Sequence, residues 1–174
     1  MHKAEKTLLL LSLVALMLKI FNVVLSDLIW LLSLTLLATL YYIFGAALFN
    51  RIPLRKILKK ERYANISRRR IVASVAFGWT MAILCIGIMF KLLFLPGSMF
   101  MLFLGFTLGL AGTLISSFFY HESKKEFFKG IWIRLIPAVL VTYALVNIPP
   151  LSLAETLEPE DIELHEKIKA QAQK

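Results

Sequence analysis

The chain has 174 residues, of which 59% are hydrophobic and 18% are charged, and its formal net charge is +9. Its mean hydropathy of +0.75 excludes a water-soluble enzyme or binding module and favours a single membrane domain with short loops. In a soluble protein this charge would suit nucleic-acid binding. Here most of it lies between two apolar runs, where basic residues mark a membrane interface.

Five apolar runs are long enough to lie in a bilayer as helices. A bilayer core takes roughly 20 apolar residues as a helix, because the backbone must satisfy its own hydrogen bonds there. The first run is expected to be a retained helix and not a cleaved signal peptide, because Lys19 interrupts it. The sequence therefore predicts an all-α, polytopic membrane domain over residues 1–154. Its spans are expected at about 7–26, 28–49, 71–94, 99–120 and 131–148.

The segment between the second and third runs is the most basic part of the chain. It sets nine basic residues against the single Glu61: Arg51, Arg55, Lys56, Lys59, Lys60, Arg62, Arg68, Arg69 and Arg70. Basic residues that flank spans usually lie on the cytoplasmic side, where they contact anionic headgroups. This loop and the N-terminus are therefore expected inside, and five spans then place the C-terminus outside.

Small residues recur at helical spacing on the third and fourth runs. They are Ser74, Gly78 and Ala82 on the third, and Gly105, Gly109 and Gly112 on the fourth. Small side chains let helix backbones approach closely, which matters in lipid because no hydrophobic force drives helices together there. The two rows predict that the third helix packs closely on the fourth, and self-association is the alternative use.

Shifting the chain by 72 residues aligns the first helical hairpin with the second without a gap. Lys19 then falls on Lys91, and Ser26 falls on Ser98. Each Lys lies near the outer end of an outgoing helix, where its long stem lifts the ammonium toward water. Each Ser precedes a returning helix whose first N–H groups it can cap. The alignment predicts two hairpins related as a parallel repeat. The alternative is two hairpins built alike because the same membrane rules apply to both.

Asp27 is the acid at the outer ends of the first four helices, and Lys19 and Lys91 are the bases there. A carboxylate within reach offsets the cost of placing an ammonium in the bilayer. We therefore expect Asp27 to pair with one lysine. Lys91 is favoured, because eight residues of one helix would separate Lys19 from Asp27 by roughly 12 Å. The alternative is that each lysine reaches water alone.

The second hairpin reads Gly-Ile-Met-Phe-Lys-Leu-Leu-Phe-Leu-Pro-Gly-Ser-Met-Phe-Met-Leu-Phe-Leu-Gly from Gly87 to Gly105. A Lys near the helix end (Lys91), a Pro-Gly turn (96–97) and a Met-Leu-x-x-Gly run (101–105) stand out. In these features it resembles the N-terminal two-helix region of the motor L-subunit family of gliding motility and type IX secretion in Bacteroidota. The resemblance covers about residues 76–120. It implies a shared hairpin architecture and a bacterial inner membrane.

Three features of that family have no counterpart in this sequence. The family's His between the Lys and the Pro corresponds to Phe94, and its membrane-embedded Glu, implicated in proton flow, corresponds to Gly109. Its long cytoplasmic region has no equivalent in these 174 residues. The resemblance therefore does not extend to proton-driven rotation.

The fifth run is the weakest of the five. Pro137, Pro149 and Pro150 interrupt it, so a re-entrant or interfacial segment is the alternative to a full crossing. Arg134 lies close enough to the inner interface for its guanidinium to reach the headgroups. Residues 155–174 are expected to form an acidic, polar C-terminal tail, for which a helix is one option.

No set of side chains in the runs points to catalysis. The sequence offers no evident buried carboxylate, metal-ligand spacing or phosphate-binding loop, and its three His residues lie in separate flanks. We therefore expect no enzyme, no cofactor or metal site, and no nucleic-acid partner.

Two functions remain. The first is a non-enzymatic scaffold or accessory subunit of a membrane complex, whose partner is a second copy or another membrane protein. The second is a small transporter or channel component in which Lys19 and Lys91 flank an outer vestibule that attracts anions. The first is favoured, because polar residues inside the helices are too few to line a pathway.

Overall fold

The computed structural model describes residues 2–21, 23–57, 59, 61, 63–64, 66–118, 125–159 and 161–172. All the regular secondary structure in these residues is helical, so the predicted all-α class is confirmed. The elements are α1 (His2–Ile20), α2 (Ser26–Phe49), the 3₁₀ turn η1 (Leu54–Lys56), α3 (Arg68–Leu92), α4 (Ser98–Phe118), α5 (Lys125–Asn147), α6 (Pro150–Leu157) and α7 (Ile162–Ala172).

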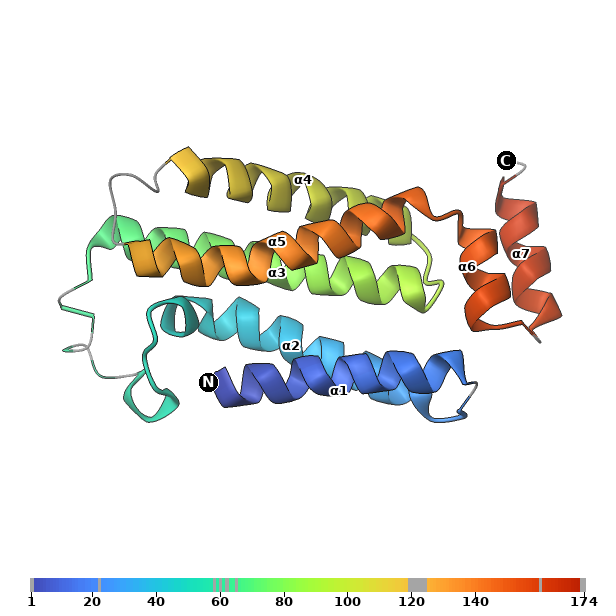
Figure 1. Cartoon of the computed structure of the whole chain (residues 1–174), viewed down its shortest axis with the longest axis horizontal. Helices are drawn as coiled ribbons and strands as arrows, with labels where there is room; N and C mark the ends of the chain where they lie inside the picture. The colour runs from blue at the N-terminus through green and yellow to red at the C-terminus, as the bar shows by residue number, and fades with distance from the viewer. Residues whose placement is uncertain are drawn as a thin grey trace.

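The long helices α1 to α5 run along the long axis of the molecule, and the short helices α6 and α7 lie together at one end (Figure 1). The same end holds the turns between α1 and α2 and between α3 and α4. We call it the turn end. At the opposite end, which we call the basic end, α2 finishes and α3 and α5 begin.

Four helices in the described part of the chain are long and apolar enough to cross a bilayer, namely α2, α3, α4 and α5. The protein is therefore a multi-pass membrane protein. α1 does not belong to this group, because its 19 residues include Lys3, Glu5, Lys6 and Lys19.

The first and fifth predicted spans differ from the helices that form. α1 ends at Ile20 and not near residue 26, because the chain turns there and the N–H of Val23 donates to the carbonyl of Leu18 (3.1 Å). α5 begins at Lys125 and not near residue 131, since its first two turns bury aromatic side chains against the bundle. Pro137 lies inside α5 without ending it.

The backbones of α2 and α3 approach each other closely at two glycines. A Cβ atom on Gly45 would lie 2.7 Å from the Cα of Gly78, and one on Gly78 would lie 2.7 Å from the carbonyl oxygen of Tyr41. Beside them, Asn50 donates to the hydroxyl of Ser74 (2.8 Å). The predicted small-residue row of the third helix therefore faces α2 and not α4, and its partner on α2 is Gly45.

The glycine row of α4 contacts two helices. A Cβ atom on Gly105 would lie 3.3 Å from the Cα of Leu84 in α3, and one on Gly109 would lie 2.6 Å from a methyl group of Val139 in α5. α4 thus approaches α3 closely, as expected from its glycines, but it meets a large residue there.

Gly112 and Ala82 complete the predicted packing residues. A Cβ atom on Gly112 would lie 3.3 Å from the ring of Phe77, and Ala82 is buried. The third helix packs closely on the fourth, as predicted, but the two small-residue rows do not face each other. α3 turns Ser74 and Gly78 toward α2 and presents Phe77 and Leu84 to α4, so each small row packs against a different neighbour.

The described part of the basic loop lies at the basic end (Figure 1), whereas Lys60 and Arg62 lie outside the described residues. Arg51 lies just beyond the C-cap of α2 and forms an exposed ion pair with Glu126 at the start of α5 (3.1 Å). The guanidinium of Arg70 lies 4.6 Å from the centre of the Phe127 ring. Charged and aromatic side chains therefore meet where α3 and α5 begin.

Candidate functional site

Three polar residues of α1 lie on one buried face. Glu5, Ser12 and Lys19 are seven residues apart, which is about two helical turns, and all three are buried. Leu10 and Leu13 lie on the exposed side. An ordinary surface helix of a soluble protein shows the reverse, with its apolar stripe turned inward. α1 therefore carries Glu5 and Lys19 inside the bundle, while several of its leucines are exposed.

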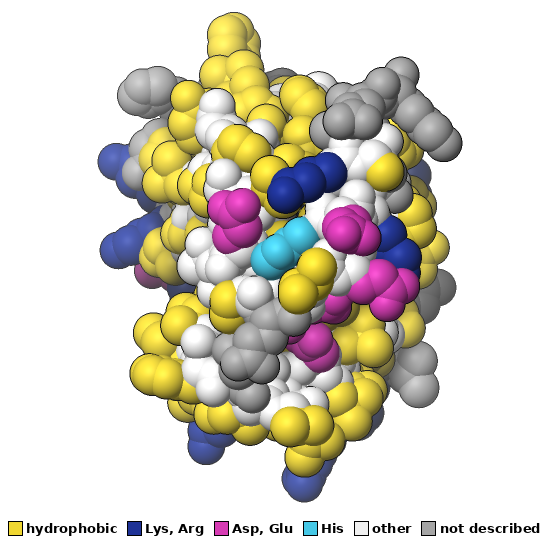
Figure 2. Space-filling model, turned by 90° about the vertical axis from the view of Figure 1, so that its right-hand side faces the viewer, with side chains coloured by type: hydrophobic (Ala, Val, Ile, Leu, Met, Phe, Trp, Pro, Cys, Tyr) yellow, Lys and Arg dark blue, Asp and Glu magenta, His cyan; other side chains and the backbone are white. Residues whose placement is uncertain are grey.

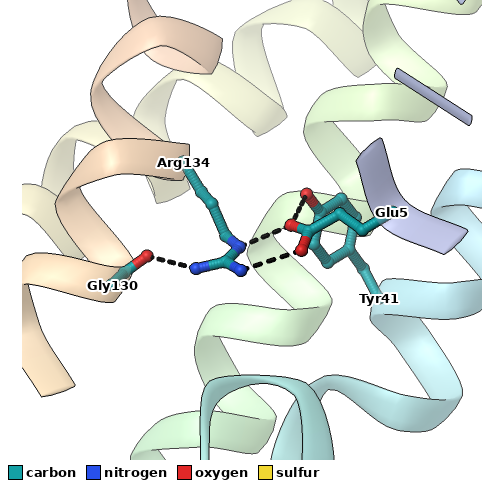
Figure 3. A network of polar contacts seen from close by, with 4 residues as sticks. All are labelled: Glu5, Tyr41, Gly130 and Arg134. Carbon is teal, nitrogen blue, oxygen red and sulfur yellow. Dashed lines mark hydrogen bonds and ion pairs between the residues drawn. The ribbon is translucent and has the colours of Figure 1, made fainter. Parts of the chain in front are cut away.

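Glu5 meets Arg134 of α5 toward the basic end of this face (Figure 3). Arg134 donates through Nε and Nη2 to the two carboxylate oxygens of Glu5, the Nη2 bond being 2.8 Å long. Its Nη1 atom donates to the carbonyl of Gly130, one turn earlier (2.6 Å). Tyr41 of α2 donates its hydroxyl to Glu5 Oε1 (2.8 Å). We call these side chains the Glu5 network, and it joins α1, α2 and α5.

The geometry of the Glu5 network suits a structural role. Glu5 is 3% exposed, so its carboxylate depends on Arg134 and Tyr41 and not on water. The two parallel bonds from Arg134 are the strong, bidentate form of this pair. Removing one partner of such a pair is costly because the other charge is left buried and alone. The network therefore specifies how α1 sits against α5.

Lys19 forms the second ion-pair cluster, at the turn end. Its ammonium lies 2.5 Å from Asp27 in the first turn of α2 and 2.5 Å from Glu158, directly after α6. The ring centre of Phe94, in the other turn, is 5.9 Å away. We call Lys19, Asp27 and Glu158 the Lys19 cluster. Between the two clusters, the hydroxyls of Ser12 and Ser33 lie 3.1 Å apart.

The structure thus pairs Asp27 with Lys19, whereas the sequence predicted a pair with Lys91. The prediction assumed that Lys19 and Asp27 lie on one continuous helix. The helix instead ends at Ile20, and the chain reverses before α2 begins at Ser26. The reversal brings residues 19 and 27 together.

An open cavity of about 470 Å³ adjoins the Lys19 cluster. Its charged lining sets Lys19 against three carboxylates, those of Asp27, Glu158 and Asp161. Figure 2 looks onto this end of the molecule, where acidic side chains gather around a histidine and hydrophobic side chains surround them. The charged lining of the cavity therefore has a negative sum, in contrast to the anion-attracting vestibule of the alternative transporter function.

Lys91 is as buried as Lys19 but has a different neighbour. It is 1% exposed, and its ammonium lies 3.4 Å from the sulfur of Met99. A thioether is a weak acceptor and carries no charge. Among the residues that the structure describes, no carboxylate forms an ion pair with Lys91.

The turns that follow Lys19 and Lys91 share their backbone hydrogen bonds at the 72-residue offset. α1 ends at Ile20 and α3 at Leu92, while α2 begins at Ser26 and α4 at Ser98. Four N–H to carbonyl bonds of the first turn, 21 to 17, 23 to 18, 26 to 23 and 29 to 25, each have a counterpart in the second. The counterparts are 93 to 89, 95 to 90, 98 to 95 and 101 to 97. At the same offset, Asp27 corresponds to Met99.

Sequence reasoning missed the Glu5 network, because no carboxylate was expected inside the bundle. A signal was present: Glu5, Ser12 and Lys19 recur every seven residues on a leucine-rich helix. That spacing puts three polar groups on one face, and in lipid such a face must turn toward other helices. The partner Arg134 is 129 residues away along the chain, so spacing could not identify it.

No protein family, curated protein or solved structure matches this chain. The two clusters are therefore interpreted from their chemistry. Within the described residues, no group of three His, Cys, Asp or Glu side chains is placed to hold a metal ion. What the clusters do hold together is helices, since each joins α1 to segments that are distant in the sequence.

Proposed function

We propose that this protein is a non-enzymatic scaffold or accessory subunit of a membrane complex. One observation carries the proposal: the buried charges of α1 bond to residues of other helices or their ends. Glu5 is satisfied by Arg134, and Lys19 by Asp27 and Glu158. An enzyme, pump or channel needs charged groups turned toward a ligand or a water path. Here they are used to fix the positions of helices.

We further propose that α1 is a fifth membrane helix. Its charges excluded it from the apolar group, but the Glu5 network and the Lys19 cluster compensate Glu5 and Lys19 inside the bundle. The remaining charges, Lys3 and Lys6, are exposed near its start, where long stems can reach headgroups. The outward leucines of α1 then face lipid. In this arrangement α1–α2 and α3–α4 are two membrane hairpins of a parallel repeat, and α5 is the last of the five spans along the chain.

For the orientation, we propose a cytoplasmic basic end in a bacterial inner membrane. The support is the positive-inside rule for the basic residues around Arg51 and the start of α3, together with the hairpin resemblance at Lys91. α6 and α7 would then lie outside, with Leu153 and Leu157 of α6 buried against the bundle. Reporter fusions after residues 60 and 126 should read cytoplasmic, and one after residue 170 should read external. A cytoplasmic signal at 170 would contradict the five-span arrangement.

The transporter alternative draws on the open cavity at the turn end. Its lysine already has two carboxylate partners, so the cavity does not offer anions a free ammonium. The excess of carboxylates in the cavity therefore argues against an anion-attracting vestibule, on which the transporter alternative depended. The scaffold proposal is therefore preferred.

A tagged chain expressed at native level tests the proposal. Extracted in mild detergent, it should migrate on native gels in an assembly larger than the purified chain in the same detergent. Purified chain in liposomes should pass ions and small solutes no faster than protein-free liposomes. Migration as a monomer, or flux above that control, would contradict the scaffold role.

A further inference from the structure

We propose that Lys91 is the docking point for a carboxylate on a membrane helix of a partner subunit. This inference rests on the proposed role as an accessory subunit and names the chemistry of the contact. It starts from the two equivalent turns of the molecule, which have the same backbone and different charge partners.

The first turn shows what an ammonium at this position binds. Lys19, one residue before the end of α1, contacts Asp27 on the returning helix and Glu158 from a separate segment. One carboxylate thus comes from the same hairpin and the other from outside it. The chain satisfies a buried lysine here with carboxylates.

The second turn has the lysine without the acids. Lys91 stands one residue before the end of α3, and Met99 occupies the place that Asp27 has in the first turn. The ammonium points at the Met99 sulfur, and no described carboxylate replaces Glu158 there. The carbonyl groups at the end of α3 favour a cation, but they do not balance a full charge. A buried ammonium at the membrane surface is left with a charge to satisfy.

A partner can reach this ammonium. Met99, whose sulfur contacts the Lys91 ammonium, is a flexible side chain and is 37% exposed, so its displacement opens a route from the surface of the bundle to the ammonium. Phe100 and Phe103 of α4 are exposed beside it, and α4 is the least buried of the four apolar helices. A helix packed along α4 would cover this apolar strip and bring one Asp or Glu to Lys91. The first turn, in which carboxylates occupy this position, favours such a group over a lipid phosphate.

A membrane-permeant carbodiimide tests the contact in native membranes. The reagent activates a carboxylate, and an amine in direct contact with it displaces a urea and forms an amide. Peptide mass spectrometry then shows which carboxylate has been joined to Lys91. Lys19 is the internal control, because it should be joined to Asp27 or Glu158 of the same chain.

We expect Lys91 to be joined to an Asp or Glu in a membrane helix of a different protein. Met99→Asp should lower that product at least about tenfold, because the new carboxylate takes the ammonium as Asp27 does in the first turn. Met99→Leu should leave the product unchanged, and Lys91→Met should abolish it. The Lys19 product should persist in all three variants and show that each is folded.

Three results would overturn the inference: a Lys19 product without any Lys91 product, a Lys91 product confined to this chain or a second copy of it, or a partner product unaffected by Met99→Asp. The native-gel assembly separates these failures from failure of the scaffold role. If the assembly persists while Lys91 has no partner product, the protein is still a subunit but docks elsewhere. If no assembly exists, the proposed function itself fails.

Discussion

The hairpins α1–α2 and α3–α4 have equivalent turns but are held by different interactions. In α1–α2, Lys19 and Asp27 form an ion pair across the turn. In α3–α4, the backbones approach closely, since a Cβ atom on Gly87 would lie 3.0 Å from the carbonyl oxygen of Met101. One hairpin relies on paired charges and the other on small side chains.

The comparison shows how a charged helix can fit into a membrane bundle. α3 and α4 meet the requirement for apolar surface by composition alone. α1 does not, but each of its buried charges has a partner in another segment. A charged helix such as α1 is stabilised in the bilayer by ion pairs with neighbouring segments, whereas an apolar helix is stabilised there by its own contact with lipid. The predictions below separate these two kinds of dependence.

The largest effect is expected for Arg134→Leu. It leaves Glu5 buried without its cation, which should lower the free energy of unfolding in detergent by about 3–5 kcal/mol. Cys85 is the only cysteine and is buried, so its reaction with a maleimide dye during heating reports unfolding. The double variant Glu5→Leu/Arg134→Leu should recover most of the loss. A double variant as unstable as the single one would mean that packing of Arg134, and not its charge, matters.

Gly109→Leu tests the packing side of the comparison. The new side chain would collide with Val139 and Leu84, so we expect a loss of about 1–3 kcal/mol in the same assay. Leu114→Phe is the matched control, because it enlarges a residue on the exposed face of α4 and should change little. Equal melting of the two variants would show that the glycine face of α4 tolerates bulk.

Lys19→Met and Lys91→Met should have opposite signs. The first removes the cation of two ion pairs, whose acids are partly exposed and can regain water, so the loss should be only about 1 kcal/mol. The second removes a buried ammonium that has no carboxylate, which should raise the stability of the isolated protein by about 1 kcal/mol. Destabilisation by both changes would contradict the difference between the two turns.

The smallest effect is expected for Arg51→Gln. This residue also pairs with a glutamate of another segment, but both side chains are exposed and hydrated. We expect a change of less than about 1 kcal/mol, which shrinks further in high salt. A loss as large as that of Arg134→Leu would show that exposure does not separate the two pairs.

Much of the fold could be predicted from composition and local pattern. The apolar runs predicted α2, α3 and α4 to within a few residues of their ends, because bilayer thickness and helix rise set that length, whereas α5 begins earlier than expected. The 72-residue offset between Lys19 and Lys91 indicated two similar turns, and their helix ends now coincide at that offset. The start of α1 was less predictable, since its early charges interrupt the apolar pattern.

The candidate site was harder to predict than the helices. Lys19, Asp27 and Lys91 were recognised as the charged residues of the turns, but the favoured partner of Asp27 was the wrong lysine. The error came from extending α1 through a turn that has no Gly or Pro to mark it. Glu158 could not have been connected to Lys19, because they are 139 residues apart in sequence.

The sequence by itself determined the solvent of this protein, the lengths of its apolar helices and the ends at which its charges gather. These properties follow from local composition, because lipid excludes unpaired polar groups wherever they occur in the chain. Only the tertiary structure decided which faces meet, such as Gly45 on Gly78 and Glu5 on Arg134. The rotation of each helix about its own axis depends on all its neighbours at once, and no local pattern contains that information.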